Sequence, residues 1–393
     1  MRRRTFAGRL ERRLPAHASF CEKAARRQDF QKEKEMKFIH TGDIHLGMSP
    51  DCDHPWSRER AQAIRETFEE IIRHARERDV DFLFIAGDLF HRQPLARDLK
   101  EVNYLFSTIP SVRVVIIAGN HDRVRPNSAL MSFTWCPNVT FLMSEEMDSV
   151  VFEDCNAQVY GFSYHTAEIT EPRLNTLDIK DNGRIQILLA HGGDSRHLPI
   201  ERSRLAQSPF SYIALGHIHK PQVLLDRRAA FCGSPEPLDK TETGPHGIFF
   251  GEINPVSRQV TALEFIPMSQ AQYISLAVSV TPKTTNGELA ARVSQEIQTR
   301  GLQHIYRFII RGMRDPDIVF DLNVLESRFR IIEIVDSSEP QYDFAQLFAE
   351  HPGDMIGFFI RALQKENMSP VEKKALYYGI NALLKTTDER SQP

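Results

Sequence analysis

The sequence contains no apolar run that approaches the roughly 20 residues needed to cross a membrane as a helix. It also lacks a Gly-x-x-x-x-Gly-Lys-Ser/Thr loop, so the chain does not supply the nucleotide-hydrolysing site of that class. Internal repeats and low-complexity tracts are absent as well. With 393 residues, the chain is long enough for two domains, or for one large domain with an appendage.

Cysteine is scarce, and no two cysteines form a Cys-x-x-Cys pair. The five positions are Cys21, Cys52, Cys136, Cys155 and Cys232. Their odd number favours reduced thiols, and therefore a cytoplasmic location. The first 35 residues contain no apolar core typical of a signal peptide, so secretion is not expected.

Positive charge is concentrated at the start of the chain. Residues 1–35 hold eleven Lys/Arg against five Asp/Glu, a net charge of +6, which leaves −9 for the remaining residues. We interpret residues 1–35 as a disordered basic extension and Met36, directly before the first strand, as the functional start. A targeting or nucleic-acid-binding tail is the alternative. Because the rest of the chain is acidic, any contact with nucleic acid is expected from local patches.

The apolar pattern predicts an α/β fold over residues 36–268. Strands and amphipathic helices alternate at the start, which favours a parallel sheet. The expected elements are strand Lys37–Thr41, helix Ser57–Arg78, strand Phe82–Ala86, helix Ala96–Ile109 and strand Val112–Ile117. From Val139 to Phe265 the pattern changes to short strands. We therefore expect a β-sandwich of two sheets packed face to face, with helices outside.

Two further units are predicted after residue 268. Residues 269–338 show a strand, a helix and two more strands, which indicates a small α/β cap domain. Residues 339–393 form a helical tail, whose last predicted helix, Val371–Thr386, has a mostly apolar stripe. That stripe packs either against the body of the protein or against a partner.

Five short polar motifs interrupt the first 268 residues, and each follows an apolar, strand-like run. They contain Asp43 and His45; Asp88 and His91; Asn120, His121 and Asp122; His191; and His217 and His219. One such motif alone is weak, because Gly, Asn and Asp also favour ordinary turns. The ordered set is more specific, because strands ending in Gly plus a carboxylate or an imidazole place metal ligands at a sheet edge. A mixed oxygen and nitrogen set suits a pair of hard or borderline divalent cations.

These motifs resemble those of the calcineurin-like metallophosphoesterase superfamily. Gly-Asp-Ile-His-Leu-Gly, Gly-Asp-Leu-Phe-His and the later Gly-Ser-Pro of 233–235 are similar to SbcD-type DNA repair exonucleases. The segment Ala-Leu-Tyr-Tyr-Gly-Ile-Asn-Ala-Leu-Leu of 375–384 resembles the YhaO group within them. The resemblance implies the metallophosphoesterase fold and a dinuclear metal site.

The resemblance also implies a role for each motif residue. One metal is expected on Asp43, His45, Asp88 and His219, and the other on Asp88, Asn120, His191 and His217. Asp88 would bridge the two metals. His121 matches the family histidine that contacts the scissile phosphate and protonates the leaving oxygen. Asp122 is expected to orient His121, and His91 matches a histidine implicated in exonuclease action.

The expected activity is a metal-dependent DNA exonuclease or endonuclease in DNA repair. Manganese is the expected ion by resemblance, while the ligand types alone also accept iron, zinc or magnesium. The expected partners are DNA and a coiled-coil ATPase subunit of the SbcC or YhaN kind, and a homodimer is left open. One alternative is a phosphomonoesterase or small phosphodiesterase acting on a nucleotide or phosphoprotein, and another is an interaction protein with a structural metal site. The sequence does not determine digestion polarity or strand preference.

Overall fold

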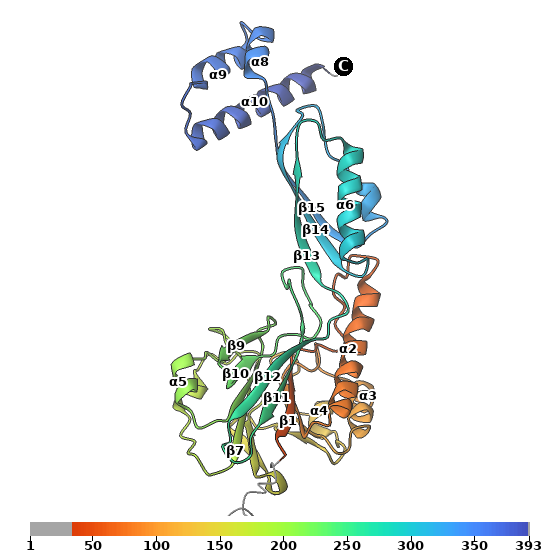
Figure 1. The fold of residues 1–393 in the computed structure, drawn as a ribbon, viewed down its shortest axis with the longest axis vertical. Helices are drawn as coiled ribbons and strands as arrows, with labels where there is room; N and C mark the ends of the chain where they lie inside the picture. Colours follow the sequence, from red (N-terminus) through yellow and green to blue (C-terminus); the bar gives the residue numbers. More distant parts are fainter. Residues whose placement is uncertain (1–33, 392–393) are drawn as a thin grey trace, which may run out of the picture.

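The computed structural model describes residues 34–391, and these form an elongated molecule with three parts (Figure 1). The basic extension expected over residues 1–35 therefore lies almost wholly outside the described residues. Within the described part of the chain, no helix combines the length and the apolar character needed to span a bilayer.

The first sheet has six strands in the order β12-β11-β1-β2-β3-β4. Strands β1 to β4 run parallel, while β11 and β12 are antiparallel additions at one side. Their bounds are β1 Met36–Thr41, β2 Phe82–Ala86, β3 Arg113–Ile117, β4 Val139–Phe141, β11 Gly247–Ile253 and β12 Val260–Pro267. All five residues of β2 are buried, as expected for a central parallel strand covered on both faces.

Helices α2 (Ser57–Glu77) and α3 (Ala96–Ser107) pack on the outer face of this sheet. Helix α2 is amphipathic, and its buried stripe includes Phe68 and Ile71, which are at most 1% exposed. The predicted alternation of strands and helices is therefore confirmed. Short helices α4 (Ala129–Ser132) and α5 (Arg202–Gln207) lie in later connections, as do the 3₁₀ turns η1 (Glu153–Cys155) and η2 (Arg173–Thr176).

The second sheet also has six strands, in the order β5-β6-β7-β8-β10-β9. Their bounds are β5 Asp148–Phe152, β6 Ala157–Gly161, β7 Ile185–His191, β8 Tyr212–Gly216, β9 Gln222–Leu225 and β10 Ala229–Phe231. A buried apolar cluster joins the two sheets, with Phe84 and Val115 from the first and Ile187 and Ala214 from the second. This confirms the expected face-to-face packing of two sheets with helices outside.

A third sheet stands at one end of the sandwich, next to the start of α2 (Figure 1). It contains the parallel strands β13 (Tyr273–Val280), β14 (Ile305–Arg314) and β15 (Ile331–Pro340). Helix α6 (Asn286–Arg300) covers one face through a separate apolar cluster, and α7 (Asn323–Glu326) packs beside it. The connection to the sandwich is small: Trp56 packs with Tyr273 and Ile305, and the Tyr273 hydroxyl donates to Asp51 at 2.8 Å.

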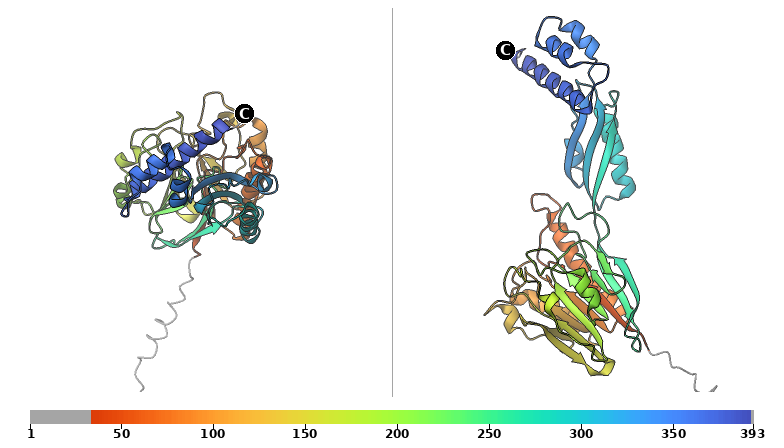
Figure 2. Two further views of the ribbon diagram at one scale, coloured as in Figure 1. Left: turned by 90° about the horizontal axis from the view of Figure 1, so that it is seen from above. Right: turned by 90° about the vertical axis from the view of Figure 1, so that its left-hand side faces the viewer.

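Helices α8 (Phe344–Glu350), α9 (Met355–Leu363) and α10 (Pro370–Ser391) form the far end of the molecule (Figures 1 and 2). Their buried residues make a cluster of their own, in which Ile356 and Ile360 of α9 meet Leu376 and Ile380 of α10. Part of the apolar stripe predicted on the last helix is thus used inside the tail, not on the body of the protein. Val371 and Tyr378 of the same helix stay 77% and 67% exposed.

Candidate metal centre

The five polar motifs meet at one edge of the sandwich, because each follows the carboxyl end of a strand. The strands are β1, β2 and β3 in the first sheet and β7 and β8 in the second, and β2 lies against both β7 and β8. Asp43, His45, Asp88 and His191 are all at most 1% exposed. Groups of their ligand atoms lie within 4.8 Å of one another. The structure therefore gathers residues that are up to 176 positions apart in sequence, from Asp43 to His219.

The backbone at this edge adopts conformations that most residues avoid. The φ angles of Asp43, His45, Asp88 and His217 are 48°, 52°, 49° and 89°. Each such residue costs on the order of 1–3 kcal/mol and persists only where the surrounding structure holds it. Strain of this kind clusters at functional sites, and here it falls on four of the seven predicted ligands.

Two motif glycines permit the side chains to approach one another. A Cβ atom on Gly87 would collide with the His191 ring, and one on Gly119 would collide with the Asp88 carboxylate. Gly87 also has a φ of 91°, which favours glycine independently. The glycines therefore have a steric reason to precede the metal-ligand candidates.

Asp88 lies at the middle of the cluster. Its Oδ2 is 3.6 Å from Nε2 of His45 and 3.3 Å from Nε2 of His191, while its Oδ1 accepts the backbone N–H of His121 at 2.9 Å. Asp43 accepts the backbone N–H of His217 at 2.9 Å. Among residues 34–391, neither carboxylate forms an ion pair with a lysine or an arginine.

His191 is held in the orientation that a metal ligand requires. Its Nδ1 donates to the Ala86 carbonyl oxygen at 2.9 Å, which turns Nε2 toward Oδ1 of Asn120 at 3.0 Å and toward Asp88. A hydrogen bond at one ring nitrogen fixes the tautomer and leaves the other nitrogen free to ligate.

The electrostatics of the cluster favour a positive charge. Burial disfavours the charged form of His191, but the carboxylates of Asp88 and Asp43 outweigh that effect and raise its pKa to about 9. Burial is likewise outweighed at His219, where Glu242 and Asp43 raise the pKa to about 9. Nε2 of His45 is buried with no hydrogen-bond partner. Buried carboxylates, an unpartnered imidazole nitrogen and no Lys/Arg counter-charge together fit a divalent cation.

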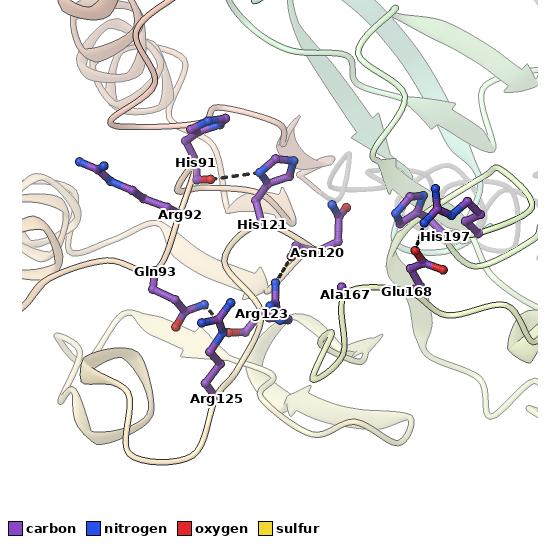
Figure 3. Close-up of a pocket in the computed structure, with 11 residues that line it drawn as sticks. His91, Arg92, Gln93, Asn120, His121, Arg123, Arg125, Ala167, Glu168 and His197 are labelled. Carbon is purple, nitrogen blue, oxygen red and sulfur yellow. Dashed lines mark hydrogen bonds and ion pairs between the residues drawn. The ribbon is translucent and has the colours of Figure 1, made fainter.

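His91 and His121 lie beside the cluster on two neighbouring loops (Figure 3). Nδ1 of His91 is 3.2 Å from Nδ1 of His45, and the rings of His91 and His121 stack with their centroids 5.1 Å apart. Nδ1 of His121 donates to the His91 carbonyl oxygen at 3.0 Å, so its Nε2 faces away from that bond. His121 is exposed, which leaves it accessible to a substrate.

Asp122 does not contact the imidazole that it was expected to orient. Its buried carboxylate accepts the backbone N–H of Gly119 at 2.8 Å and of Phe90 at 3.1 Å. Asp122 therefore ties the loop after β3 to the loop after β2, and the His91 carbonyl is what holds the His121 ring. Burial and the nearby Asp88 raise the Asp122 pKa to about 7.

Two carboxylates that the sequence analysis missed support the last histidine pair. Asp194 accepts from Nε2 of His217 at 2.7 Å, and Glu242 accepts from Nδ1 of His219 at 2.7 Å. Asp194 also accepts from Nδ1 of His197 at 3.0 Å. Asp194 follows His191 by three residues, which is a weak signal, whereas nothing near Glu242 in the sequence marks it.

Comparison with known proteins agrees with this geometry. The family described as calcineurin-like phosphoesterase matches residues 36–251, which contain all of the strands that carry the cluster. A relative named "Uncharacterized metallophosphoesterase YhaO", from Bacillus subtilis (strain 168), is 26% identical over 306 residues, or 71% of this chain and 72% of the relative. The resemblance to the YhaO group is thus confirmed.

Other similar proteins carry the name "DNA double-strand break repair protein Mre11". The one from Methanopyrus kandleri is 27% identical over 288 residues, 66% of this chain and 62% of that protein. The one from Haloferax volcanii is 30% identical over 235 residues, 56% of this chain and 50% of that protein. The matches thus span about half to three fifths of these two relatives.

A family match over more than half of the chain, on a fold with two mixed sheets and flanking helices, settles the class. The chain belongs to the calcineurin-like phosphoesterase family and is a metal-dependent phosphoesterase.

Proposed function

We propose that this protein is a phosphodiesterase that acts on DNA with two divalent cations. The single observation that carries the proposal is the arrangement around Asp88, whose buried Oδ2 lies 3.6 Å from Nε2 of His45 and 3.3 Å from Nε2 of His191. A carboxylate so placed can offset the repulsion between two cations about 3.5–4 Å apart.

We assign the ligands in two sets that share Asp88. The first set is Asp43, His45, Asp88 and His219, and the second is Asp88, Asn120, His191 and His217. Support for the first comes from the grouping of Asp43, His45 and His219, and support for the second from the short contact between Asn120 and His191. Bound cations would supply positive charge to the phosphate oxygens and make a nucleophile available near neutral pH. We expect manganese, on the family resemblance.

His121 is the residue that we assign to the leaving group. Its Nδ1 hydrogen is committed to the His91 carbonyl oxygen, so Nε2 is the atom that holds or releases a proton toward substrate. Its ring stands 4.8 Å from that of His45, and its backbone N–H is bound to Asp88. These contacts keep the imidazole next to the ligands, where a scissile phosphate would lie. We assign His91 to positioning, since it contacts both His45 and His121.

The choice of DNA as substrate rests on the similar proteins named for DNA double-strand break repair. The third sheet and the tail add support, because a small-molecule phosphatase needs neither. We further propose that a coiled-coil ATPase subunit of the SbcC or YhaN kind is the partner. The exposed Val371 and Tyr378 on α10 are apolar positions that such a subunit could cover.

Digestion of end-labelled DNA tests the proposal directly. The purified protein is incubated with single-stranded and double-stranded oligonucleotides, with manganese, with magnesium and with a chelator. We expect shortening of the labelled strand that depends on manganese and is absent from an Asp43→Asn variant prepared in parallel, which controls for contaminating nucleases. Hydrolysis of a nucleotide monoester by the wild type, with DNA left intact, would favour the phosphomonoesterase alternative.

A further inference from the structure

A pocket of about 580 Å³ opens next to the metal centre (Figure 3). Asn120 and His121 form part of its wall, so the pocket is continuous with the candidate catalytic residues. The rest of the wall comes from the loops that follow β2 and β3 and from two loops of the second sheet. An extended substrate bound at the centre can therefore continue into this space.

The pocket carries a net positive charge on a protein whose residues 36–393 total −9. Four arginines line it, Arg92, Arg123, Arg125 and Arg196, against the single carboxylate of Glu168. Glu168 is already neutralised by its ion pair with Arg196 on the far wall. The remaining three arginines lie on the loops that follow β2 and β3, and among the described residues no other carboxylate lines the pocket to compensate their charge.

These three arginines have few partners of their own. Within residues 34–391, the side chains of Arg92 and Arg125 have no hydrogen-bond or ion-pair partner, and Arg123 donates only to the Asn120 carbonyl oxygen, at 3.1 Å. Arg123 and Arg125 line the same pocket on the single loop that follows β3. Two cations placed close together without a carboxylate cost free energy, which a bound anion would recover.

We propose that Arg92, Arg123 and Arg125, called here the arginine pocket, bind the phosphate adjacent to the scissile one in a nucleic acid strand. This deepens the proposed function and rests on it. The planar guanidinium groups present paired N–H donors that match phosphate oxygens. Arg123 is two residues from His121 and three from Asn120, so a phosphate held there shares one short loop with the reacting centre.

The arginine pocket gives the acidic body a local means of choosing its substrate. A strand offers a second phosphate one nucleotide away from the bond that is cut, whereas a phosphomonoester or a small diester does not. Contacts with the second phosphate would therefore raise kcat/KM for strands selectively. Focused positive charge in a cleft also raises the local concentration of an anionic substrate, and salt weakens this effect.

Substrates that differ only by one phosphate test the inference. One pair is the p-nitrophenyl ester of thymidine 5′-phosphate with and without a 3′-phosphate. The other is the p-nitrophenyl ester of thymidine 3′-phosphate with and without a 5′-phosphate. Within a pair the scissile bond and the leaving group are identical. We expect the second phosphate to raise kcat/KM about tenfold in one pair, the lower end for charge-assisted hydrogen bonds in a solvated pocket, and the responding pair gives the direction of the strand.

The variant is the double substitution Arg123→Ala and Arg125→Ala, and its matched control is Arg202→Ala, an exposed arginine at the start of α5. The increase in kcat/KM caused by the second phosphate should fall below twofold in the double variant and stay near tenfold in the control. The single variant Arg125→Ala gives an intermediate gain and serves if the double variant does not fold. A wild-type gain of one in both pairs, or a full gain in the double variant, overturns the inference.

Inhibition experiments distinguish two possible ligands of the arginine pocket, a nucleic acid strand and a free polyphosphate, because both present adjacent phosphate groups. The dinucleotide pTpT should inhibit the wild type more strongly than pyrophosphate does, and stronger inhibition by pyrophosphate would overturn the assignment to a strand. A second-phosphate gain without any digestion of end-labelled DNA would instead contradict the proposed function and leave the arginine pocket in place. The two failures are therefore distinguishable.

Discussion

The metal centre and the C-terminal third of this protein are built in opposite ways. At the centre, buried side chains from five strands are held by backbone N–H groups, glycine clearances and positive φ angles. The third sheet and the tail instead have small apolar cores of their own. The third sheet meets the sandwich through Trp56 packed on Tyr273 and through the surface ion pairs Lys240–Glu333 and Arg330–Glu59. The difference separates a centre whose side chains are fixed by many backbone contacts from appended parts that make few contacts with it.

Of the changes considered, loss of the Asp88 carboxylate charge at the metal centre should have the largest effect. We expect Asp88→Asn to abolish hydrolysis and to leave a folded protein that binds fewer than two metal ions, because an amide cannot offset two close cations. Metal content after dialysis and the melting temperature measure the two effects separately. Retention of two manganese ions with normal turnover would disprove the bridging role.

Replacement of His121 with alanine should leave metal binding intact and reduce turnover by roughly 10²–10⁴, the usual contribution of a positioned general acid. The loss should be smaller for bis(p-nitrophenyl) phosphate, since p-nitrophenolate leaves without protonation. Steady-state kinetics on this ester and on an oligonucleotide give the comparison. An equal loss on both would mean that His121 binds phosphate and does not donate a proton.

A shortened protein that ends after Met268 tests whether hydrolysis at the metal centre is independent of the third sheet and the tail. All seven proposed ligands and His121 precede that residue, so a soluble shortened protein should still hydrolyse bis(p-nitrophenyl) phosphate with manganese. It should lose most activity on duplex DNA and all binding to an ATPase subunit. Assays at two salt concentrations show whether phosphate contacts were lost, because fewer contacts flatten the salt dependence. Digestion of duplex DNA at the full-length rate would refute a role for the C-terminal parts in DNA binding.

The smallest effect is expected from substitution of Asp194 and Glu242, the carboxylates that accept hydrogen bonds from His217 and His219. Asp194→Asn and Glu242→Gln should each weaken metal binding about 10–100-fold, since such partners fix the imidazole orientation. Calorimetric titration with manganese measures this without relying on turnover. The exposed Asp226→Asn variant is the control, because Asp226 lies at the end of β9 and contacts neither histidine. Unchanged affinity in both variants would show that the histidines are held by packing alone.

The order of strands and helices and the metal-ligand candidates could be predicted from the sequence, because both follow from local patterns. The alternation of buried strands with amphipathic α2 and α3 is written in local hydrophobic periodicity, and the position of each ligand candidate after a strand is a local feature as well. Asp122 shows where this reasoning stopped. Its place beside His121 suggested a contact with the imidazole, but side-chain direction depends on the loop conformation, and the carboxylate turned to Gly119 and Phe90.

The sequence by itself determined the fold class, the family and the set of residues able to ligate metal, because these depend on residue type and on order along the chain. Only the tertiary structure decided which side chains support that set and where a charged pocket opens. Glu242 reaches His219 across 23 residues, and Arg92 joins Arg123 and Arg125 from a different loop. Such contacts arise because the two sheets pack face to face and because neighbouring strands end at the same edge of a sheet. No local pattern in the chain encodes the distance between the loops that this packing brings together.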